Sequence, residues 1–311
     1  MMASRPARIR KILVALGHVQ HPSRALFRKA AAIARASGSS IELFHADVSG
    51  RSGPELGKSA ARKLDRLLAS PWLEGLKVAL HLDSDYPPHE AIVRRAIATG
   101  ADLVIASLRV PHLPARLWLR NTDWELIRQC PCPVLLVKSS RPYRNPAIIA
   151  AVDPFHVHAK PAALDEKLLA TGATLARALR GTLHAFHSYM PLLNTLPTPM
   201  GPVVPIGFPT EMEDLHGQQV AALFDKLAKT AGIAPARRHL HMGIVTDELC
   251  ATVRHLHAGM VVMGAVSRSA LKRAFIGNTA ETVLNAIPCD VLIVKPRLFR
   301  TSVPRRKGAR A

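Results

Sequence analysis

The chain of 311 residues repeats one pattern twice, and this repeat limits its fold more than any other feature. Short apolar runs typical of buried strands begin at Ile12 and recur in the same order from Ile148. Between them lie segments with apolar residues at three- and four-residue spacing, which indicates amphipathic helices. A glycine, Gly38 or Gly181, is predicted to end the first helix of each half. Strands that alternate with helices indicate two α/β units built in the same way.

We predict that each half is a doubly wound domain, a five-stranded parallel sheet in the order 3-2-1-4-5 with helices on both faces. The first domain is expected over residues 10–140 and the second over residues 147–296, with residues 141–146 as the linker. Residues 1–9 form a basic N-terminal extension, and residues 297–311 form a basic tail that we expect to be disordered. We expect the two domains to pair within the chain. The sequence leaves their relative orientation, the oligomeric state and the protein partners open.

The second half is longer than the first because it carries extra segments. Matching positions lie 136 residues apart at the first strand and 157 apart at the last. Part of the extra length lies around residues 155–163, and the rest lies in residues 190–209, which we call the Pro-rich insert. Its six prolines prevent regular helix or sheet, and its many apolar side chains should not face water freely. We expect it to pack against the other domain; a lid over a ligand site and a cover for a hydrophobic pocket are the alternatives.

The chain is strongly basic, with a formal net charge of +20 that is partly concentrated at its two ends. Clustered basic ends can bind nucleic acid or an anionic membrane, but we favour solvated tails, so nucleic-acid binding is the weaker alternative. No apolar run approaches the ~20 residues that span a bilayer, and the first one is too short for a signal-peptide core. We therefore expect a cytoplasmic protein without a membrane span.

Patterns that carry catalysis, redox chemistry or metal binding are weak in this chain. Four cysteines are too few for a disulfide framework. Cys130 and Cys132 flank a proline before a strand, and we interpret them as small buried residues because they do not form a Cys-x-x-Cys motif. His239 and His241 share one face of a predicted strand, but no carboxylate or cysteine completes a metal set, so we predict no metal. Without a Ser/His/Asp or Walker motif, we predict no catalytic residue.

The strongest sign of a ligand is the loop that follows the apolar run 259–263. Gly264 leaves this predicted strand, and Gly277 stands directly before Asn278 and Thr279 at a predicted helix start. A strand, a Gly/Ser-rich loop and a helix N-terminus together form an anion site, since backbone N–H groups point outward and the helix dipole favours phosphate. The loop has the form Gly-x2-Ser-x9-Gly-Asn-Thr.

In this loop, and in three strings of which one overlaps it, the chain resembles the universal stress proteins, most closely the tandem-domain, E-type members. The strings are Thr-Asp-Trp-Glu-Leu-Ile-Arg-Gln-Cys-Pro at 122–131, Phe-Ile-Gly-Asn-Thr-Ala-Glu at 275–281 and Cys-Asp-Val-Leu-Ile-Val-Lys-Pro at 289–296. The resemblance covers about residues 10–296. It implies a non-catalytic binding or regulatory protein of the stress response.

The resemblance also implies one adenine-nucleotide site in the second half. In nucleotide-binding relatives the loop has the form Gly-x2-Gly-x9-Gly-Ser/Thr and holds the ATP phosphates, while an Asp that ends the first strand contacts the adenosine. Mg²⁺ would accompany ATP, and the guanidinium of the loop arginine could face phosphate. Carried over residue by residue, the implied site comprises Asp153, Gly264, Ser267, Arg268, Gly277, Asn278 and Thr279.

Two of these positions depart from the family pattern. Ser267 stands where relatives have glycine, which costs roughly 1 kcal/mol if the position needs a positive φ. Asn278 stands where Ser or Thr is usual, although Asn can cap the helix with Glu281 as its capping-box partner. The loop is therefore either a nucleotide site or only a well-capped helix entry, and weak ATP hydrolysis stays open.

The first half has lost the motif and is predicted to be a structural partner that binds no nucleotide. Glycine replaces the aspartate, and the loop glycines are absent. The replacing residues are Gly17, Ser107, Val110 and Arg120. The alternative function for the whole chain is a nucleotide-free scaffold that binds an apolar ligand or a protein partner through the Pro-rich insert.

Overall fold

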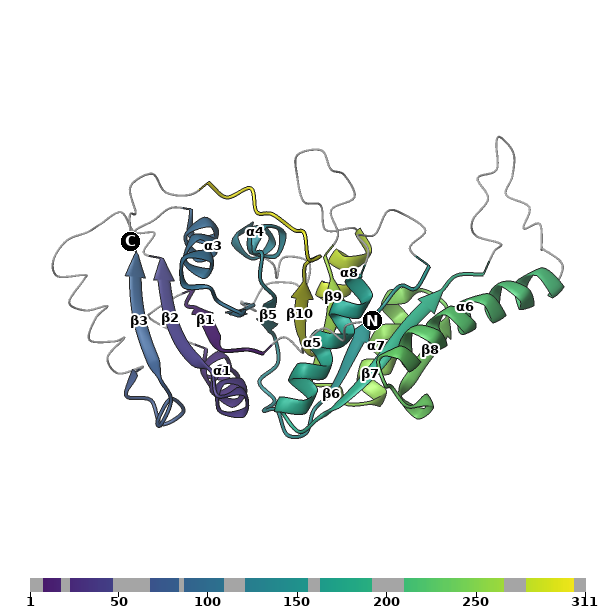
Figure 1. Ribbon diagram of the computed structural model, residues 1–311, viewed down its shortest axis with the longest axis horizontal. Helices are drawn as coiled ribbons and strands as arrows, with labels where there is room; N and C mark the ends of the chain where they lie inside the picture. Colours follow the sequence, from purple (N-terminus) through teal and green to yellow (C-terminus); the bar gives the residue numbers. More distant parts are fainter. Residues whose placement is uncertain are drawn as a thin grey trace.

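The computed structural model describes residues 8–17, 23–46, 68–83, 87–108, 121–155, 163–191, 210–265 and 278–304. Over these ranges the chain forms one ten-stranded sheet with helices on both faces, and the two halves lie side by side (Figure 1). The α/β prediction is therefore confirmed.

Each half alternates strands and helices along the chain. The first half contains β1 (Lys11–Ala15), α1 (Arg24–Ser37), β2 (Ser40–Ala46), β3 (Val78–Asp83), α3 (Pro88–Thr99), β4 (Leu103–Ser107), α4 (Asn121–Gln129) and β5 (Val134–Val137). The second half contains β6 (Ala147–Ala151), α5 (Leu164–Ala178), β7 (Thr182–Tyr189), α6 (Thr210–Thr230), the short 3-10 helix η3 (Pro235–Arg237), β8 (Arg238–Met242), α7 (Val245–His255), β9 (Met260–Gly264), α8 (Asn278–Ala286) and β10 (Asp290–Val294).

The strand order across the sheet is β3-β2-β1-β4-β5-β10-β9-β6-β7-β8. Each half therefore has the predicted order 3-2-1-4-5, with parallel neighbours inside each half. The halves meet at one antiparallel pair, β5 with β10, which we call the seam. There Val134 lies opposite Ile293 and Leu136 opposite Val291, so the start of each strand lies beside the end of the other. The seam decides the relative orientation that the sequence left open.

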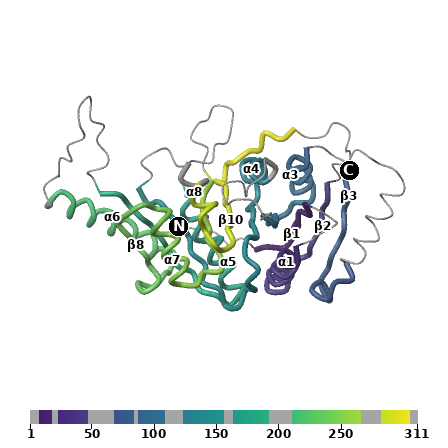
Figure 2. The backbone as a smooth tube through the Cα atoms, turned by 180° about the vertical axis from the view of Figure 1, so that it is seen from behind, coloured from purple at the N-terminus to yellow at the C-terminus, as the bar shows by residue number. Residues whose placement is uncertain are grey.

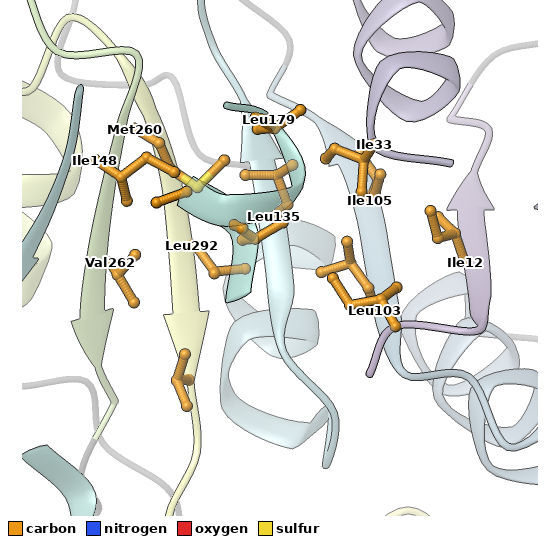
Figure 3. Packing of buried hydrophobic residues seen from close by; sticks show 14 of the residues in the cluster. Ile12, Ile33, Leu103, Ile105, Leu135, Ile148, Leu179, Met260, Val262 and Leu292 are labelled. Carbon is orange, nitrogen blue, oxygen red and sulfur yellow. The ribbon is translucent and has the colours of Figure 1, made fainter. Parts of the chain in front are cut away.

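The core continues across the seam without a break. In Figure 3, labelled residues from Ile12 in the first half to Ile148 in the second form one row of apolar side chains over the sheet. This face is covered by α1, α5 and α6, and the other face by α3, α4, α7 and α8. Strands buried on both faces need apolar residues at nearly every position, which explains the continuous apolar runs in the sequence.

Helices α1 and α5 end differently, although the sequence suggested the same glycine exit for both. Gly38 has φ 68° and terminates α1 in the left-handed conformation that glycine favours. After α5 the left-handed residue is Arg180, with φ 54°, and Gly181 follows it. A Cβ atom on Gly181 would lie 2.1 Å from the carbonyl oxygen of Pro146. The prediction of one shared role is therefore wrong: Gly181 is required by the close approach of the chain entering β6.

The prediction of a disordered tail does not hold for residues 297–304. Residues 296–304, which we call the C-terminal strap, run from β10 across α4 towards α3 in the other half (Figure 2). Val303 is buried in the core of that half, and the Pro304 carbonyl accepts a hydrogen bond of 2.9 Å from Arg94 Nε. The buried apolar side chain holds a segment that its basic composition had suggested was solvated. Residues 305–311 lie outside the described residues.

Among the helices described, none is long and apolar enough to cross a membrane. The four cysteines are free thiols.

Candidate functional site

The carboxyl ends of β6 and β9 form the topological switch point of the second half. These strands are neighbours in the sheet, with Ile148 opposite Met260 and Ala150 opposite Val262. From β6 the chain continues to β7 on one side, and from β9 it continues to β10 on the other. In an open α/β sheet the crevice between such diverging connections is where ligands bind.

Asp153 lies at this point, two residues beyond β6, with an exposed side chain. Its backbone N–H donates a hydrogen bond of 3.2 Å to Oδ1 of Asp165, which is fully buried in the first turn of α5. Asp165 thus fixes the backbone that carries Asp153, while the Asp153 carboxylate stays open to solvent. A carboxylate placed in this way can accept hydrogen bonds from the hydroxyl or amino groups of a ligand.

Gly264 ends the neighbouring strand, and its lack of a side chain has a packing reason. A Cβ atom there would lie 2.8 Å from Cδ2 of Leu164, which is completely buried at the start of α5. The next residue, Ala265, donates its N–H to the Val294 carbonyl at 3.1 Å. Gly264 therefore allows α5 to approach the end of β9, whether or not a ligand binds there.

Most of the predicted loop lies beyond what the structure describes. Ser267, Arg268 and Gly277 fall in residues 266–277, which are outside the described ranges. Helix α8 begins at Asn278 with Thr279 next, but nothing is described of the side chains of residues 278–281. Of the predicted site, the structure places Asp153, Gly264 and the first turn of α8.

The matching point in the first half lacks the carboxylate. Gly17 follows β1, and Ser107 ends β4, which pairs with β1. Val110 and Arg120 lie outside the described residues. The two halves thus present different chemistry at equivalent switch points.

Of the two histidines that raised the question of a metal, His239 and His241, the first contacts His184 on the neighbouring strand β7. His184 Nδ1 lies 2.9 Å from His239 Nε2, and the two rings stack with centroids 5.2 Å apart. Burial, together with the neighbouring His239 and Arg237, lowers the pKa of His184 to about 4. Within the described part of the chain, no group of three or more His, Cys, Asp or Glu residues could hold a metal ion.

An apolar surface lies along α6, the helix that follows the Pro-rich insert. A groove of about 430 Å³ between α5 and α6 is lined mainly by apolar side chains. Three large apolar side chains of α6 are also exposed: Met212 by 48%, Leu215 by 55% and Leu223 by 41%. Residues 192–209 of the insert itself lie outside the described residues.

Sequence reasoning missed the polar contacts at the seam, which are centred on Asp290. Its carboxylate is fully buried at the start of β10. Oδ1 accepts the backbone N–H groups of Lys138 and Ser139, each at 2.9 Å. Oδ2 accepts hydrogen bonds from Lys29 Nζ and, at 2.5 Å, from the Tyr143 hydroxyl. Asp290 therefore ties the second half to α1 and to the linker.

Two lysines cross the seam in a reciprocal way. Lys138, at the end of β5, donates to the carbonyls of Leu284 and Ile287 at the end of α8, each at 2.5 Å. Lys295, after β10, donates to the Arg128 carbonyl at the end of α4 at 3.1 Å. A cation suits the free carbonyls of a helix C-terminus. Each half thus caps the last helix of the other. The sequence shows this only as a lysine directly after the last apolar run of each half.

Comparison with known proteins places these features in a family context. A model described as "Universal stress protein family" matches residues 8–138 and 148–295. "Universal stress protein E" of Escherichia coli (strain K12) is 32% identical over 234 residues, covering 70% of this chain and 67% of that protein.

Solved structures agree with the fold. A functionally unknown protein from Pseudomonas aeruginosa PAO1 superposes with a TM-score of 0.72 at 26% identity, covering 93% of this chain and 94% of that chain. A universal stress protein from Archaeoglobus fulgidus DSM 4304 has a TM-score of 0.64 at 13% identity, covering 92% and 98%. The second likeness bears on the fold alone.

Proposed function

Because this chain belongs to the universal stress protein family and carries two copies of its domain in tandem, we propose that it is a non-catalytic stress-response protein that binds one adenine nucleotide in its second half. ATP, with Mg²⁺, is the expected ligand. The proposed contacts are Asp153, Gly264, Ser267, Arg268, Gly277, Asn278 and Thr279.

The observation that carries this proposal is the exposed carboxylate of Asp153 at the switch point beside Gly264. Asp153 would accept hydrogen bonds from the adenosine, and the backbone N–H groups at the start of α8 would face the phosphates. The hydrogen bond from the Asp153 backbone to Asp165 supports a preformed site, because it lowers the conformational entropy that would be lost when a ligand binds.

A direct test uses the freshly purified full chain. Denaturation followed by mass spectrometry identifies any nucleotide carried through purification, and calorimetric titration with ATP, with and without Mg²⁺, gives affinity and stoichiometry. We expect one nucleotide per chain. Asp153→Ala should weaken binding by about tenfold or more, because a hydrogen bond to a charged group contributes about 1.5–3 kcal/mol.

The matched control is Asp214→Ala, which removes another exposed carboxylate, this one on α6. It should leave ATP affinity unchanged, because it alters the net charge in the same way at a distance from the switch point. If both variants weakened ATP binding equally, the loss of affinity would come from the change in net charge and not from a contact with Asp153. Wild-type protein that ignores millimolar ATP would contradict the proposal.

Two further variants address the departures from the family pattern. Ser267→Gly should tighten ATP binding if the loop position needs a positive φ, since glycine removes roughly 1 kcal/mol of strain. Gly17→Asp should leave the stoichiometry at one, because Ser107 and Arg120 still occupy the glycine positions of the first half. A second equivalent of ATP in this variant would show that the aspartate alone decides binding.

The exposed apolar surface of α6 favours a second candidate, a nucleotide-free scaffold for an apolar ligand or a protein partner. An apolar patch of this kind on a monomer is usually an interaction site. The dye anilinonaphthalene sulfonate reports such surfaces. The scaffold proposal expects dye binding that disappears when Leu215 and Leu223 are both changed to Gln, together with no response to ATP. Dye binding that survives these changes would exclude α6 as the surface.

The domain limits at residues 10–140 and 147–296, the linker 141–146 and a cytoplasmic location are parts of the same proposal. Limited proteolysis should cut first at the linker between the two domains, and fractionation of cells should place the protein in the cytoplasm. Nucleic-acid binding by the basic ends is less favoured; if it occurs, removal of residues 305–311 should weaken it and flatten its salt dependence.

A further inference from the structure

Cys130 and Cys132 lie together at the seam, between α4 and the start of β5. Their Sγ atoms are 3.4 Å apart. Cys130 is fully buried, whereas Cys132 is partly exposed. The pair thus combines a partly exposed cysteine with a fully buried one whose thiol is in contact with it.

The backbone holds the two thiols in this arrangement. The N–H of Cys130 donates to the Leu126 carbonyl at 2.9 Å, and the carbonyl of Pro133 accepts the N–H of Val104 at 2.9 Å. Between these anchors the chain bends at Pro131, whose ring fixes φ. Residues two apart cannot separate by more than ~7 Å between Cα atoms, which is close to the range that disulfides require. Closing a disulfide therefore needs only a small movement of the sulfur atoms.

Two lysines lie near the pair. Burial lowers the pKa of both, while the nearby Cys130 opposes that shift at Lys295 and the nearby Cys132 opposes it at Lys167. Lys167 Nζ also donates to the Lys295 carbonyl at 2.7 Å, which fixes it beside the seam. Burial lowers the pKa of Lys295 to about 8, so a fraction of its amine is neutral near pH 7.5. The hydrogen bond with Cys132 and burial raise the pKa of the Cys130 thiol well above its ordinary value, so Cys130 keeps its proton until it reacts, and the partly neutral amine of Lys295 is the base that can accept that proton.

The other two cysteines provide an internal contrast. Cys289 is the counterpart of Cys132 in the repeat, but Ile287 stands where the first half has Cys130. Cys289 is buried, and burial raises its pKa to about 12. Cys250 is buried on α7, and burial raises its pKa as well. Only in the first half does the repeat place one thiol against another.

We propose that Cys130 and Cys132 are a peroxide-oxidised dithiol that closes reversibly to a disulfide. This revises the interpretation from the sequence, in which the two residues were packing residues only. The inference does not depend on nucleotide binding.

The chemistry runs in two steps. The Cys132 thiolate attacks one oxygen of a hydroperoxide; the O–O bond breaks, the sulfenic acid forms, and the other oxygen leaves as water or an alcohol after taking up a proton. The Cys130 sulfur, whose proton passes to Lys295, then attacks the sulfenyl sulfur. The S–O bond breaks, the disulfide forms and water leaves. Two thiols have lost two electrons to one peroxide, and an external dithiol reverses the change.

A peptide of the chain makes this proposal measurable. Trypsin should cut after Arg128 and Lys138, so both cysteines fall in the peptide 129–138, which contains no other cysteine. The folded full chain is treated with hydrogen peroxide, its remaining thiols are blocked with iodoacetamide, and the digest is analysed by mass spectrometry. We expect peptide 129–138 to lose two hydrogen atoms and to escape alkylation, and dithiothreitol to restore both thiols.

Variants separate the two steps. Cys130→Ser should stop at a sulfenic acid on Cys132 that dimedone traps, and Cys132→Ser should leave Cys130 reduced at peroxide concentrations that oxidise the wild type. Cys289→Ser is the matched control and should oxidise as the wild type does. The wild-type peptide keeps the test valid if a variant fails to fold. Full alkylation of peptide 129–138 after peroxide, or a disulfide to another chain through Cys132, would overturn the proposal.

Discussion

The two halves of the molecule have the same strand order and differ at several strand termini. At the carboxyl end of the first strand, the second half has Asp153 and the first half has Gly17. At the seam, β10 begins with the buried Asp290, whereas Pro133 takes that place before β5. Strand interiors must stay apolar because helices cover both faces, but strand ends face loops and can change. Duplication therefore preserved the sheet and left the chemistry of its edges free to diverge.

The two ends of the seam illustrate this divergence most clearly. One end is held by charge, since the Asp290 carboxylate contacts α1 and the linker through several donors. The other end carries the thiols Cys130 and Cys132, with Lys295 beside them. The reciprocal lysine caps are common to both ends. One seam thus combines a fixed polar anchor with a site whose chemistry can change.

The largest effect is expected when the charged end of the seam is broken. Asp290→Ala leaves Lys29, which is only 2% exposed, without its anion, and breaking a buried ion pair costs about 3–5 kcal/mol. Pro133→Ala changes the equivalent position of the other end and should cost less than about 1 kcal/mol. Urea unfolding measures both. Similar losses for the two variants would show that the ends of the seam do not differ as described.

The helix exits of the two halves provide the next test. Gly181→Ala forces a Cβ atom into the Pro146 carbonyl and should cost about 3 kcal/mol of unfolding free energy, as overpacking does. Gly38→Ala meets no atom within 4 Å and costs only the left-handed backbone, about 1 kcal/mol. If thermal or urea unfolding gave the two variants equal stability, the close approach at Gly181 would be unimportant.

The seam lysines should differ in their pH dependence. Burial lowers the pKa of Lys295 from its ordinary 10.5 to about 8. Between pH 8 and 10.5 this lysine is protonated in the unfolded chain but largely neutral in the folded chain, so its contribution makes the free energy of unfolding rise with pH. Below pH 8 the lysine is charged in both states, and burying the charge lowers the free energy of unfolding by the full amount of about 3 kcal/mol. Lys295→Met should therefore gain stability relative to the wild type mainly below pH 8, and this gain should shrink by pH 10.5.

Lys138→Met is the matched variant at the other end of the seam. Burial lowers the pKa of Lys138 too, but Cys289, Cys250 and Asp290 oppose that shift. Its pH-dependent gain should have the same sign and a smaller size, measured by urea unfolding at several pH values. A larger effect for Lys138 than for Lys295 would contradict the asymmetry between the two ends.

The smallest effect concerns the left-handed residue after α5. Arg180→Gly gives this position the residue that the first half already has in Gly38, and it should stabilise the chain by up to about 1 kcal/mol. The greater backbone freedom of glycine in the unfolded chain offsets part of this gain. A melting-temperature comparison with the wild type suffices, and clear destabilisation would mean that the Arg180 side chain contributes contacts of its own.

Much of the fold follows from sequence patterns because they reflect local requirements. Apolar runs such as residues 12–15 and 148–150 indicate strands that helices cover on both sides, and the repeat indicates two domains of one kind. The predicted order 3-2-1-4-5 is confirmed in both halves. Asp153 could be singled out in the same way, since it follows a strand in a chain with a recognisable motif, although its role in binding stays a prediction.

Other features depend on contacts between residues distant in the sequence. The contact of Lys29 with Asp290 and the packing of Val303 against the first half join positions that no local pattern relates. From the sequence, Cys130 and Cys132 were interpreted as packing residues, because their spacing alone does not give the distance between the two sulfur atoms. Charge suggested a solvated tail, but the buried Val303, the hydrogen bond to the Pro304 carbonyl and the contact of Lys295 with the Phe299 ring hold residues 297–304 in place.

The sequence by itself therefore determined the two α/β domains, their strands and the family to which they belong, because periodicity and motif are properties of short segments. Only the tertiary structure decided that β5 and β10 pair in antiparallel fashion, that Asp290 and the two lysines fasten the halves together, and that two thiols meet at the seam. The physical reason is that these contacts form only when the edge strands of the two halves pair. Each contact needs one partner from each half, so no short segment of the sequence contains both.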